Sequence, residues 1–163
     1  ADKEFRELID KAHSMKIYII LDIVLNHVGD LFNYEGMRDQ APWNSEREYE
    51  IYWRNEKGEA QGQWTDIGQI DHLPKDCGIW PEEFQRNDYF RRRGTYDDSP
   101  YPAQGDFSRM KELVTEYFIQ SENKHPVRDH LIRSYQYLIA KFDLDGYRID
   151  TYQYDQRRMQ SPQ

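Results

Sequence analysis

The chain has 163 residues, a length typical of one ordinary domain. Apolar residues make up 37% of it and charged residues 32%, and the net charge is −8. This acidic balance argues against a nucleic acid or an anionic membrane surface as the main partner, and no apolar run is long enough for a transmembrane helix. The single cysteine, Cys77, excludes a disulfide within the chain. Extracellular, periplasmic and cytoplasmic locations are all compatible with this composition.

The N-terminal part of the sequence predicts one helix followed by one strand. Apolar residues recur at helical spacing over residues 2–15. The run over residues 17–25 is apolar almost throughout, as in a strand that is covered on both faces in a parallel sheet. Asp22 interrupts this strand, and a carboxylate there needs a cation nearby. The strand ends in Asn26 and His27, two polar residues placed where the chain leaves the sheet.

Residues 28–124 show no sustained periodicity and form a long excursion between the predicted elements. Strand-to-helix connections in α/β folds usually take about 2–6 residues, so a longer excursion at this place predicts part of a substrate cleft. Within it, residues 51–54 and residues 61–64 are candidates for a β-hairpin. The basic triplet at residues 91–93 is interpreted as a solvated loop.

A second helix and a second strand follow the excursion. Pro126 stands at a typical first helical position, and an apolar stripe continues from there to Phe142. Residues 146–150 then predict a strand on which Arg148 and Asp150 share one face. The order of helix, strand, excursion, helix and strand is typical of a parallel α/β fold.

Two short motifs on the predicted strands resemble signatures of the α-amylase family of retaining glycoside hydrolases and transglycosylases. The first signature, Asp-x-Val-x-Asn-His, is matched by residues 22–27, and the second, Gly-x-Arg-x-Asp, by residues 146–150. The resemblance implies an α/β fold, a partial (β/α)8 TIM barrel with a long irregular β-rich insertion after the third strand. Residues 1–29 and 123–163 would be barrel segments that carry the third and fourth strands, and residues 30–122 the inserted domain.

The resemblance also implies roles for the motif residues. In a retaining mechanism one carboxylate attacks the anomeric carbon, and a second carboxyl group about 5–5.5 Å away protonates the leaving oxygen. Asp150 is then the nucleophile, and Arg148 orients it and pairs with Asp22. His27, Asp22 and Tyr147 become substrate-binding residues for an oligosaccharide or an α-glucan. The family's general acid belongs to a later strand, so the rest of the barrel is needed for a complete site.

Many members of this family bind a structural calcium ion, and Asn26 and Glu112 are the candidate ligands here. Calcium takes six to eight oxygen ligands. The choice of Glu112 aligns residues 105–116 with the family segment that returns from the insertion, and an alternative alignment uses residues 72–76. The Lys-His pair that calcium-binding amylases carry after the nucleophile is replaced by Gln-Tyr at residues 153–154. This departure weakens the expectation of calcium and of the specificity of a typical starch amylase.

Two other functions are open at this point. The first is a non-catalytic carbohydrate-binding or amylase-like subunit, because a fold does not guarantee an activity. The second is a phosphatase of the haloacid-dehalogenase type, whose first motif residues 142–146 resemble. Against the phosphatase, Tyr147 stands where that motif expects Thr or Val.

Overall fold

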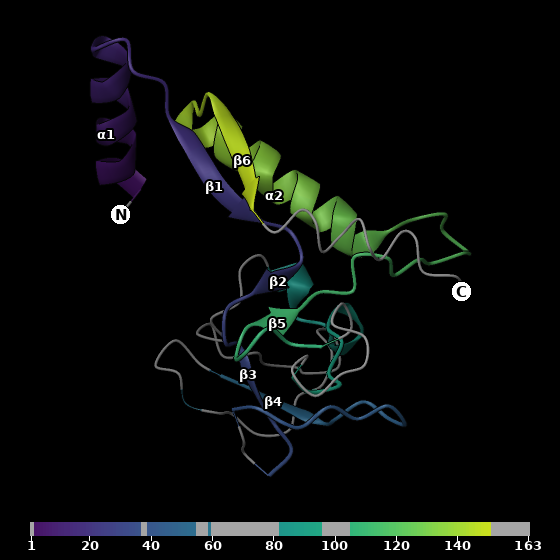
Figure 1. The fold of residues 1–163 in the computed structure, drawn as a ribbon. Helices are drawn as coiled ribbons and strands as arrows, with labels where there is room; N and C mark the ends of the chain where they lie inside the picture. Colours follow the sequence, from purple (N-terminus) through teal and green to yellow (C-terminus); the bar gives the residue numbers. More distant parts are fainter. Residues whose placement is uncertain (1, 37–38, 55–58, 60–81, 96–104, 151–163) are drawn as a thin grey trace.

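The structure is a computed structural model that describes residues 2–36, 39–54, 59, 82–95 and 105–150. Its elements are, in chain order, α1 (Asp2–Ser14), β1 (Ile20–Val24), β2 (His27–Val28), β3 (Phe32–Tyr34), β4 (Ile51–Trp53), η1 (Glu82–Phe84), η2 (Asn87–Tyr89), β5 (Lys111–Glu112), α2 (Pro126–Phe142) and β6 (Gly146–Asp150). Helices α1 and α2 lie with β1 and β6 in one half of the molecule, and β2 to β5 lie in the other half (Figure 1). No described helix has the length and apolar character needed to cross a membrane.

Strands β1 and β6 pair in parallel, as the order of elements predicted. Their register places Ile20 opposite Gly146, Asp22 opposite Arg148, and Val24 opposite Asp150, and the other pairs follow in step. Because the two strands run in the same direction, their carboxyl ends lie at the same edge of the sheet.

Strand β1 is shorter than the predicted run of residues 17–25, because its first residues terminate helix α1 instead. Lys16 has a left-handed backbone with φ of 61°. Its N–H donates to the carbonyl of His13, and the N–H of Ile17 donates to the carbonyl of Ala12 over 3.0 Å. This is the hydrogen-bond pattern that closes many helix C-termini. Ile17 is therefore committed to the helix end and not to the sheet.

Helix α2 has the bounds that the sequence predicted. It begins at Pro126, whose missing N–H is not needed in the first turn. It ends at Phe142, since Asp143 adopts a left-handed conformation and its N–H donates to the carbonyl of Ile139 over 2.8 Å. The end of α2 packs on α1 and on the start of β6, in a small core with Ile9, Phe142 and Leu144 at its centre.

The excursion has an aromatic core, which Val127 of α2 completes. Phe32 of β3 lies at its centre, with edge-on ring contacts to Trp53 and Phe90 at centroid distances of 5.5 Å each. Two short antiparallel sheets surround this core, one of β3 and β4 and one of β2 and β5. The buried members of the core are Phe32, Tyr34, Ala41, Tyr49, Ile51, Trp53, Phe84, Tyr89, Phe90, Leu113 and Val127. The predicted pairing of residues 51–54 with residues 61–64 concerns a segment outside the described residues.

The interpretation of residues 91–93 as a solvated loop is wrong. The Arg91 side chain is 18% exposed and pairs with Glu116, and the Arg92 side chain is 15% exposed and pairs with Glu48. The Arg93 guanidinium donates to backbone carbonyls of residues 44 and 45. The triplet thus fastens distant parts of the excursion to one another. The sequence does not reveal these contacts, because the partners of the three arginines lie more than 20 residues away along the chain.

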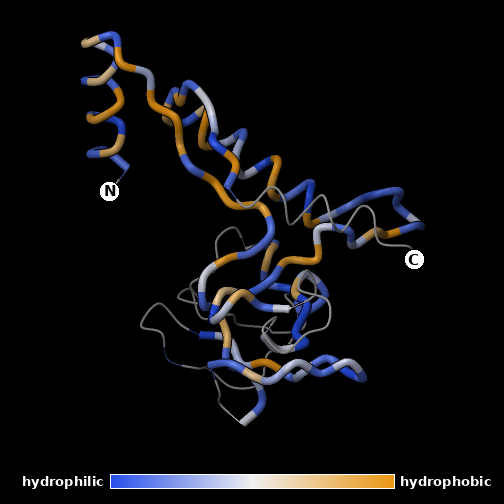
Figure 2. Tube along the Cα trace, viewed as in Figure 1, coloured by the Kyte–Doolittle hydropathy of each residue, from blue (hydrophilic) through white to orange (hydrophobic). Residues whose placement is uncertain are grey.

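The expectation that the first strand is covered on both faces is also wrong for the residues described. Apolar residues follow β1 almost throughout (Figure 2). Leu21 packs toward the core between the helices, whereas Ile20 on the opposite face is 63% exposed. Ile149 of β6 shares the face of Leu21 and is 45% exposed. The described sheet has two strands, and its helices cover one face only.

Candidate active site

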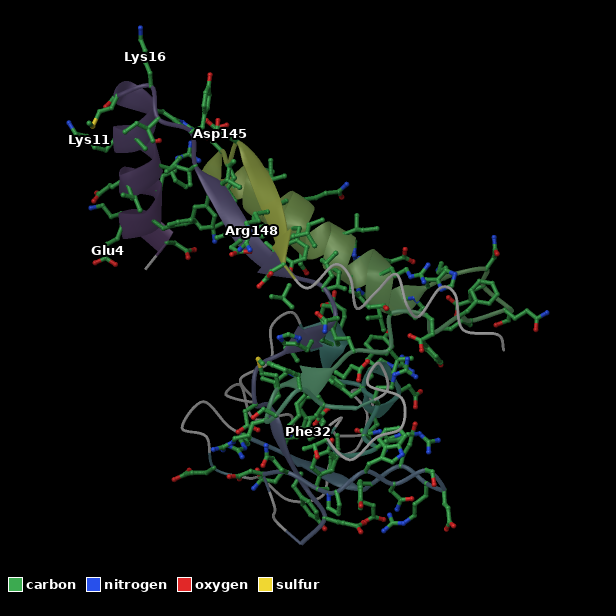
Figure 3. The ribbon with its side chains drawn as sticks, in the orientation of Figure 1. Glu4, Lys11, Lys16, Phe32, Asp145 and Arg148 are labelled. Carbon is green, nitrogen blue, oxygen red and sulfur yellow. The ribbon has the colours of Figure 1, made fainter. Side chains whose placement is uncertain are left out.

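Strands β1 and β6 bring Asp22 and Arg148 together. The two residues are register partners, and Nη1 of Arg148 forms a hydrogen-bonded ion pair with Oδ2 of Asp22. Nη2 of Arg148 lies 3.5 Å from Oδ1 of Asp150 on the same strand. The sequence-based expectation of an Asp22–Arg148 contact is confirmed, and Arg148 lies on β6 directly beside β1 (Figure 3).

This carboxylate–guanidinium–carboxylate row is exposed. The side chains of Asp22, Arg148 and Asp150 are 54%, 63% and 51% exposed. Ion pairs in contact with water contribute little to folding stability. The row therefore matters for orientation: one guanidinium holds two carboxylates on one face of the sheet. Asp150 occupies the last position of β6, at the edge where active sites lie in barrels of parallel strands.

His27 lies just beyond the same edge, in the short strand β2. It pairs with Glu112 across the antiparallel β2–β5 ladder. Its ring lies 6.2 Å from the ring of Phe107, with an angle of 32° between the two planes. Phe107 comes from the excursion and is 44% exposed. An imidazole and an open aromatic face thus stand together where the chain leaves β1.

The sequence analysis missed Phe107 as a member of this site. The ring has a defined place because its neighbour Asp106 is anchored in the protein interior. Asp106 is 1% exposed and accepts hydrogen bonds from the Tyr34 hydroxyl over 2.6 Å and from the Glu112 N–H over 3.0 Å. A buried acid that fixes a turn leaves no periodic signal in the sequence. The only local signal for Phe107 is that it directly follows Asp106 in the segment that leads out of the excursion.

A buried lysine completes the anchor. Nζ of Lys111 lies 3.3 Å from Oδ2 of Asp106, and the Lys111 side chain is wholly buried. Burial raises the pKa of Asp106 to about 6, against the opposing attraction of Lys111. Burial likewise lowers the pKa of Lys111. Nζ also lies 4.8 Å from the ring centroid of Phe32 and 4.7 Å from that of Tyr34. The cation is thus held between a carboxylate and two aromatic faces.

The structure does not bring Tyr147 together with Arg148 and Asp150. The Tyr147 hydroxyl donates to the backbone carbonyl of Tyr135 on α2. The Tyr135 hydroxyl in turn donates to the carbonyl of Val24 over 2.9 Å. The two tyrosines therefore tie α2 to the strands from the face opposite the charged row. The substrate-binding role of Tyr147 stays a prediction.

Asn26 and Glu112 lie on neighbouring backbone segments, because the carbonyl of Asn26 accepts the N–H of Leu113 over 2.9 Å. Both side chains belong to buried residues, at 8% and 2% exposure. Across the described ranges, no group of three or more His, Cys, Asp and Glu side chains is arranged to hold a metal ion. Two oxygen donors fall short of the six to eight that calcium takes. The alternative alignment at residues 72–76 and the Gln-Tyr pair at residues 153–154 lie outside the described residues.

A comparison with protein families accounts for this arrangement. The family model described as "Alpha amylase, catalytic domain" matches residues 1–163. The chain belongs to the alpha-amylase family. Neither the curated proteins nor the solved structures gave a match. The catalytic domain of this family is a TIM barrel, and the parallel pair of β1 and β6 with α2 between them in the chain agrees with that architecture. Family membership also gives the chain a function of the glycoside hydrolase type.

Proposed function

We propose that this chain supplies the nucleophile half of a retaining active site that cleaves α-glucosidic bonds. The observation that carries the proposal is the row of Asp22, Arg148 and Asp150 at the carboxyl edge of β1 and β6. Asp150 would attack the anomeric carbon and form a covalent glycosyl-enzyme. Water or an acceptor sugar would then release the glycosyl group.

Arg148 would orient Asp150 during this reaction, since its Nη2 lies 3.5 Å from Oδ1 of Asp150. A carboxylate nucleophile has to be held toward the anomeric carbon that it attacks. Asp22 occupies the other side of the same guanidinium and so fixes its position through the Nη1 contact. We place the general acid on a later strand of the barrel, beyond these 163 residues.

His27 and Phe107 would border the sugar at the bond being cleaved. The imidazole would donate hydrogen bonds to sugar hydroxyls, and the exposed ring of Phe107 would pack against an apolar sugar face. In this assignment β1 and β6 are the third and fourth barrel strands, and residues 30–122 are the inserted domain. Most of the aromatic core and the whole β3–β4 sheet lie within residues 30–122, which supports that division.

The assignment of Asp150 can be tested with a fluorinated glucosyl fluoride, which carries its own leaving group and traps the glycosyl-enzyme. In the complete barrel enzyme that contains this chain, we expect mass spectrometry to find the adduct on the peptide with Asp150. Asp150→Asn should form no adduct. Asp143→Asn is the matched control, because Asp143 is an exposed carboxylate seven residues earlier at the end of α2. An adduct on any other residue would refute the assignment.

A structural calcium ion at Asn26 and Glu112 is a separate proposal. Asn26 directly precedes β2 and Glu112 is the last residue of β5, so an ion there would hold the two segments together. If the ion binds, millimolar calcium should raise the thermal midpoint of the chain, and the Glu112→Gln variant should lose that response. A midpoint that calcium leaves unchanged would rule the site out.

A second candidate function is that of a non-catalytic amylase-like subunit. Measurements on the complete protein distinguish it from the retaining enzyme. Tight binding of maltooligosaccharides without turnover in the complete protein would favour the subunit. The phosphatase alternative is no longer supported, because the match to the alpha-amylase family model covers residues 142–146 together with the rest of the chain.

A further inference from the structure

The excursion packs on helix α2 at Val127, at Leu131 and at His130, whose ring meets two aromatic residues. The His130 ring lies 5.8 Å from the ring of Phe84 in η1 and 5.8 Å from the ring of Tyr89 in η2. Both of these aromatic residues are buried members of the excursion's core. His130 itself projects from α2 and is partly exposed. This imidazole therefore stands at the contact between residues 82–90 and the helix.

The hydrogen bonds of His130 require a neutral ring. Nη2 of Arg133 lies 2.6 Å from Nδ1 of His130. A guanidinium has donors only, so Nδ1 must accept and the ring proton must sit on Nε2. Nε2 lies 3.4 Å from the Tyr89 hydroxyl oxygen, to which it can donate. The packing of the excursion on α2 thus fixes one tautomer and one charge state.

A proton on Nδ1 would break this arrangement. The nitrogen could no longer accept, and an imidazolium would face the Arg133 guanidinium at hydrogen-bond distance. The charged groups that act on the ring are Asp129 and Arg133 of α2, Glu83 of η1, and Arg86, which pairs with Asp88 of η2. Burial lowers the pKa of His130 below its ordinary 6.5, and Arg133 lowers it further against the opposing pull of Glu83 and Asp129.

We propose that His130 is a pH-operated latch that holds residues 82–90 against helix α2 at neutral pH and releases them in acid. A histidine whose pKa is depressed in the closed state stabilises that state above the ordinary value of 6.5, and the stabilisation is lost as the pH falls through the depressed value.

The latch is connected to the candidate active site through the backbone. The carbonyl of Tyr89 accepts the N–H of Val114 over 2.8 Å, and the N–H of Arg91 donates to the carbonyl of Glu112 over 3.0 Å. Glu112 is the strand partner of His27. Release of residues 82–90 therefore loosens the segment beside His27. The inference does not depend on the proposed catalytic role of Asp150, because it concerns a contact within the fold.

Hydrogen exchange followed by mass spectrometry tests the latch on the chain itself. Protection of residues 82–90, corrected for the intrinsic exchange rate and compared with β3, should fall at least about fivefold between about pH 7.5 and about pH 5. His130→Gln keeps an acceptor for Arg133 and a donor for Tyr89 but cannot take up a proton, so its protection should change less than about twofold. His125→Gln is the matched control, since it removes a histidine beside α2 that does not contact η1 or η2, and it should keep the full response.

Two outcomes would overturn the latch. One is an equal loss of protection in His130→Gln and in the original chain. The other is constant protection in the original chain across the same pH range. An NMR titration gives an independent check: the His130 ring should titrate below 6.5 in the folded chain, and Arg133→Met should move its midpoint upward. A midpoint at or above 6.5 in the unsubstituted chain would likewise contradict the proposal.

Discussion

At the residue scale, the buried Lys111–Asp106 pair constrains the part of the excursion that faces the candidate active site. The carboxylate binds the Tyr34 hydroxyl, the Glu112 N–H and the ammonium group at once. It therefore sets the position of both Phe107 and β5. Removing one partner of a buried ion pair leaves an uncompensated charge, which costs far more than removing both.

This asymmetry gives the first prediction. Lys111→Met should lower the free energy of unfolding by about 3–5 kcal/mol at neutral pH, because the Asp106 carboxylate is then buried without its cation. The loss should shrink in acid. The pKa of Asp106 is already raised to about 6, and without Lys111 it rises further, so the buried acid becomes neutral more readily. Urea unfolding at neutral and at acidic pH measures both effects.

The double variant Lys111→Met/Asp106→Asn provides the control, since it removes both charges and should recover most of the lost stability. An unfolding free energy for Lys111→Met that falls equally at both pH values would contradict this account. So would a double variant no more stable than the single one.

At the scale of elements, the sequence predicted what depends on local chemistry. Pro126 and the apolar stripe gave the bounds of α2, and the alternation over residues 146–150 gave β6. The Asp22–Arg148 contact was predictable because a charge on an apolar strand needs a partner on the next one. The fastening of residues 91–93 was not predictable, because Glu48 and Glu116 lie far away in the chain. The anchor of Phe107 was not predictable either, because it depends on the burial of Asp106 and on its contact with the distant Tyr34.

The start of β1 shows how a helix end can override a strand signal, and it yields a second prediction. Lys16 holds the left-handed position that closes α1, where a side chain with a Cβ is strained and glycine is not. Lys16→Gly should therefore raise the free energy of unfolding by about 0.5–1 kcal/mol. Lys11→Gly is the matched control within α1, where the same substitution should cost about 1 kcal/mol. The two lysines project away from the sheet, so neither change disturbs its packing (Figure 3). Urea unfolding measures both free energies. If Lys16→Gly and Lys11→Gly changed the free energy of unfolding in the same direction, the role of Lys16 as the helix cap would be refuted.

At the scale of the whole molecule, the described chain is two units of different character. The excursion gathers an aromatic core around Phe32, to which α2 adds Val127, whereas β1 and β6 leave Ile20 and Ile149 partly open to solvent. These two side chains lie on opposite faces of the sheet, so the two strands by themselves leave apolar surface uncovered on both faces. The catalytic domain of the alpha-amylase family is a TIM barrel. The excursion, which buries its aromatic core already, depends on the rest of that barrel less than β1 and β6 do.

This contrast gives the last prediction, which concerns activity. A retaining reaction needs a second carboxyl group about 5–5.5 Å from the nucleophile, and our proposal puts that group beyond these residues. The chain alone should therefore release no more reducing sugar from maltooligosaccharides than its own Asp150→Asn variant does. Folding has to be verified in the same samples, for which slow hydrogen exchange in β3 and β4 is a suitable marker, since both strands lie in the excursion's core. Sugar release by the folded chain above that of Asp150→Asn would show that the acid lies within these 163 residues, and the assignment of catalytic roles would have to be redrawn around it.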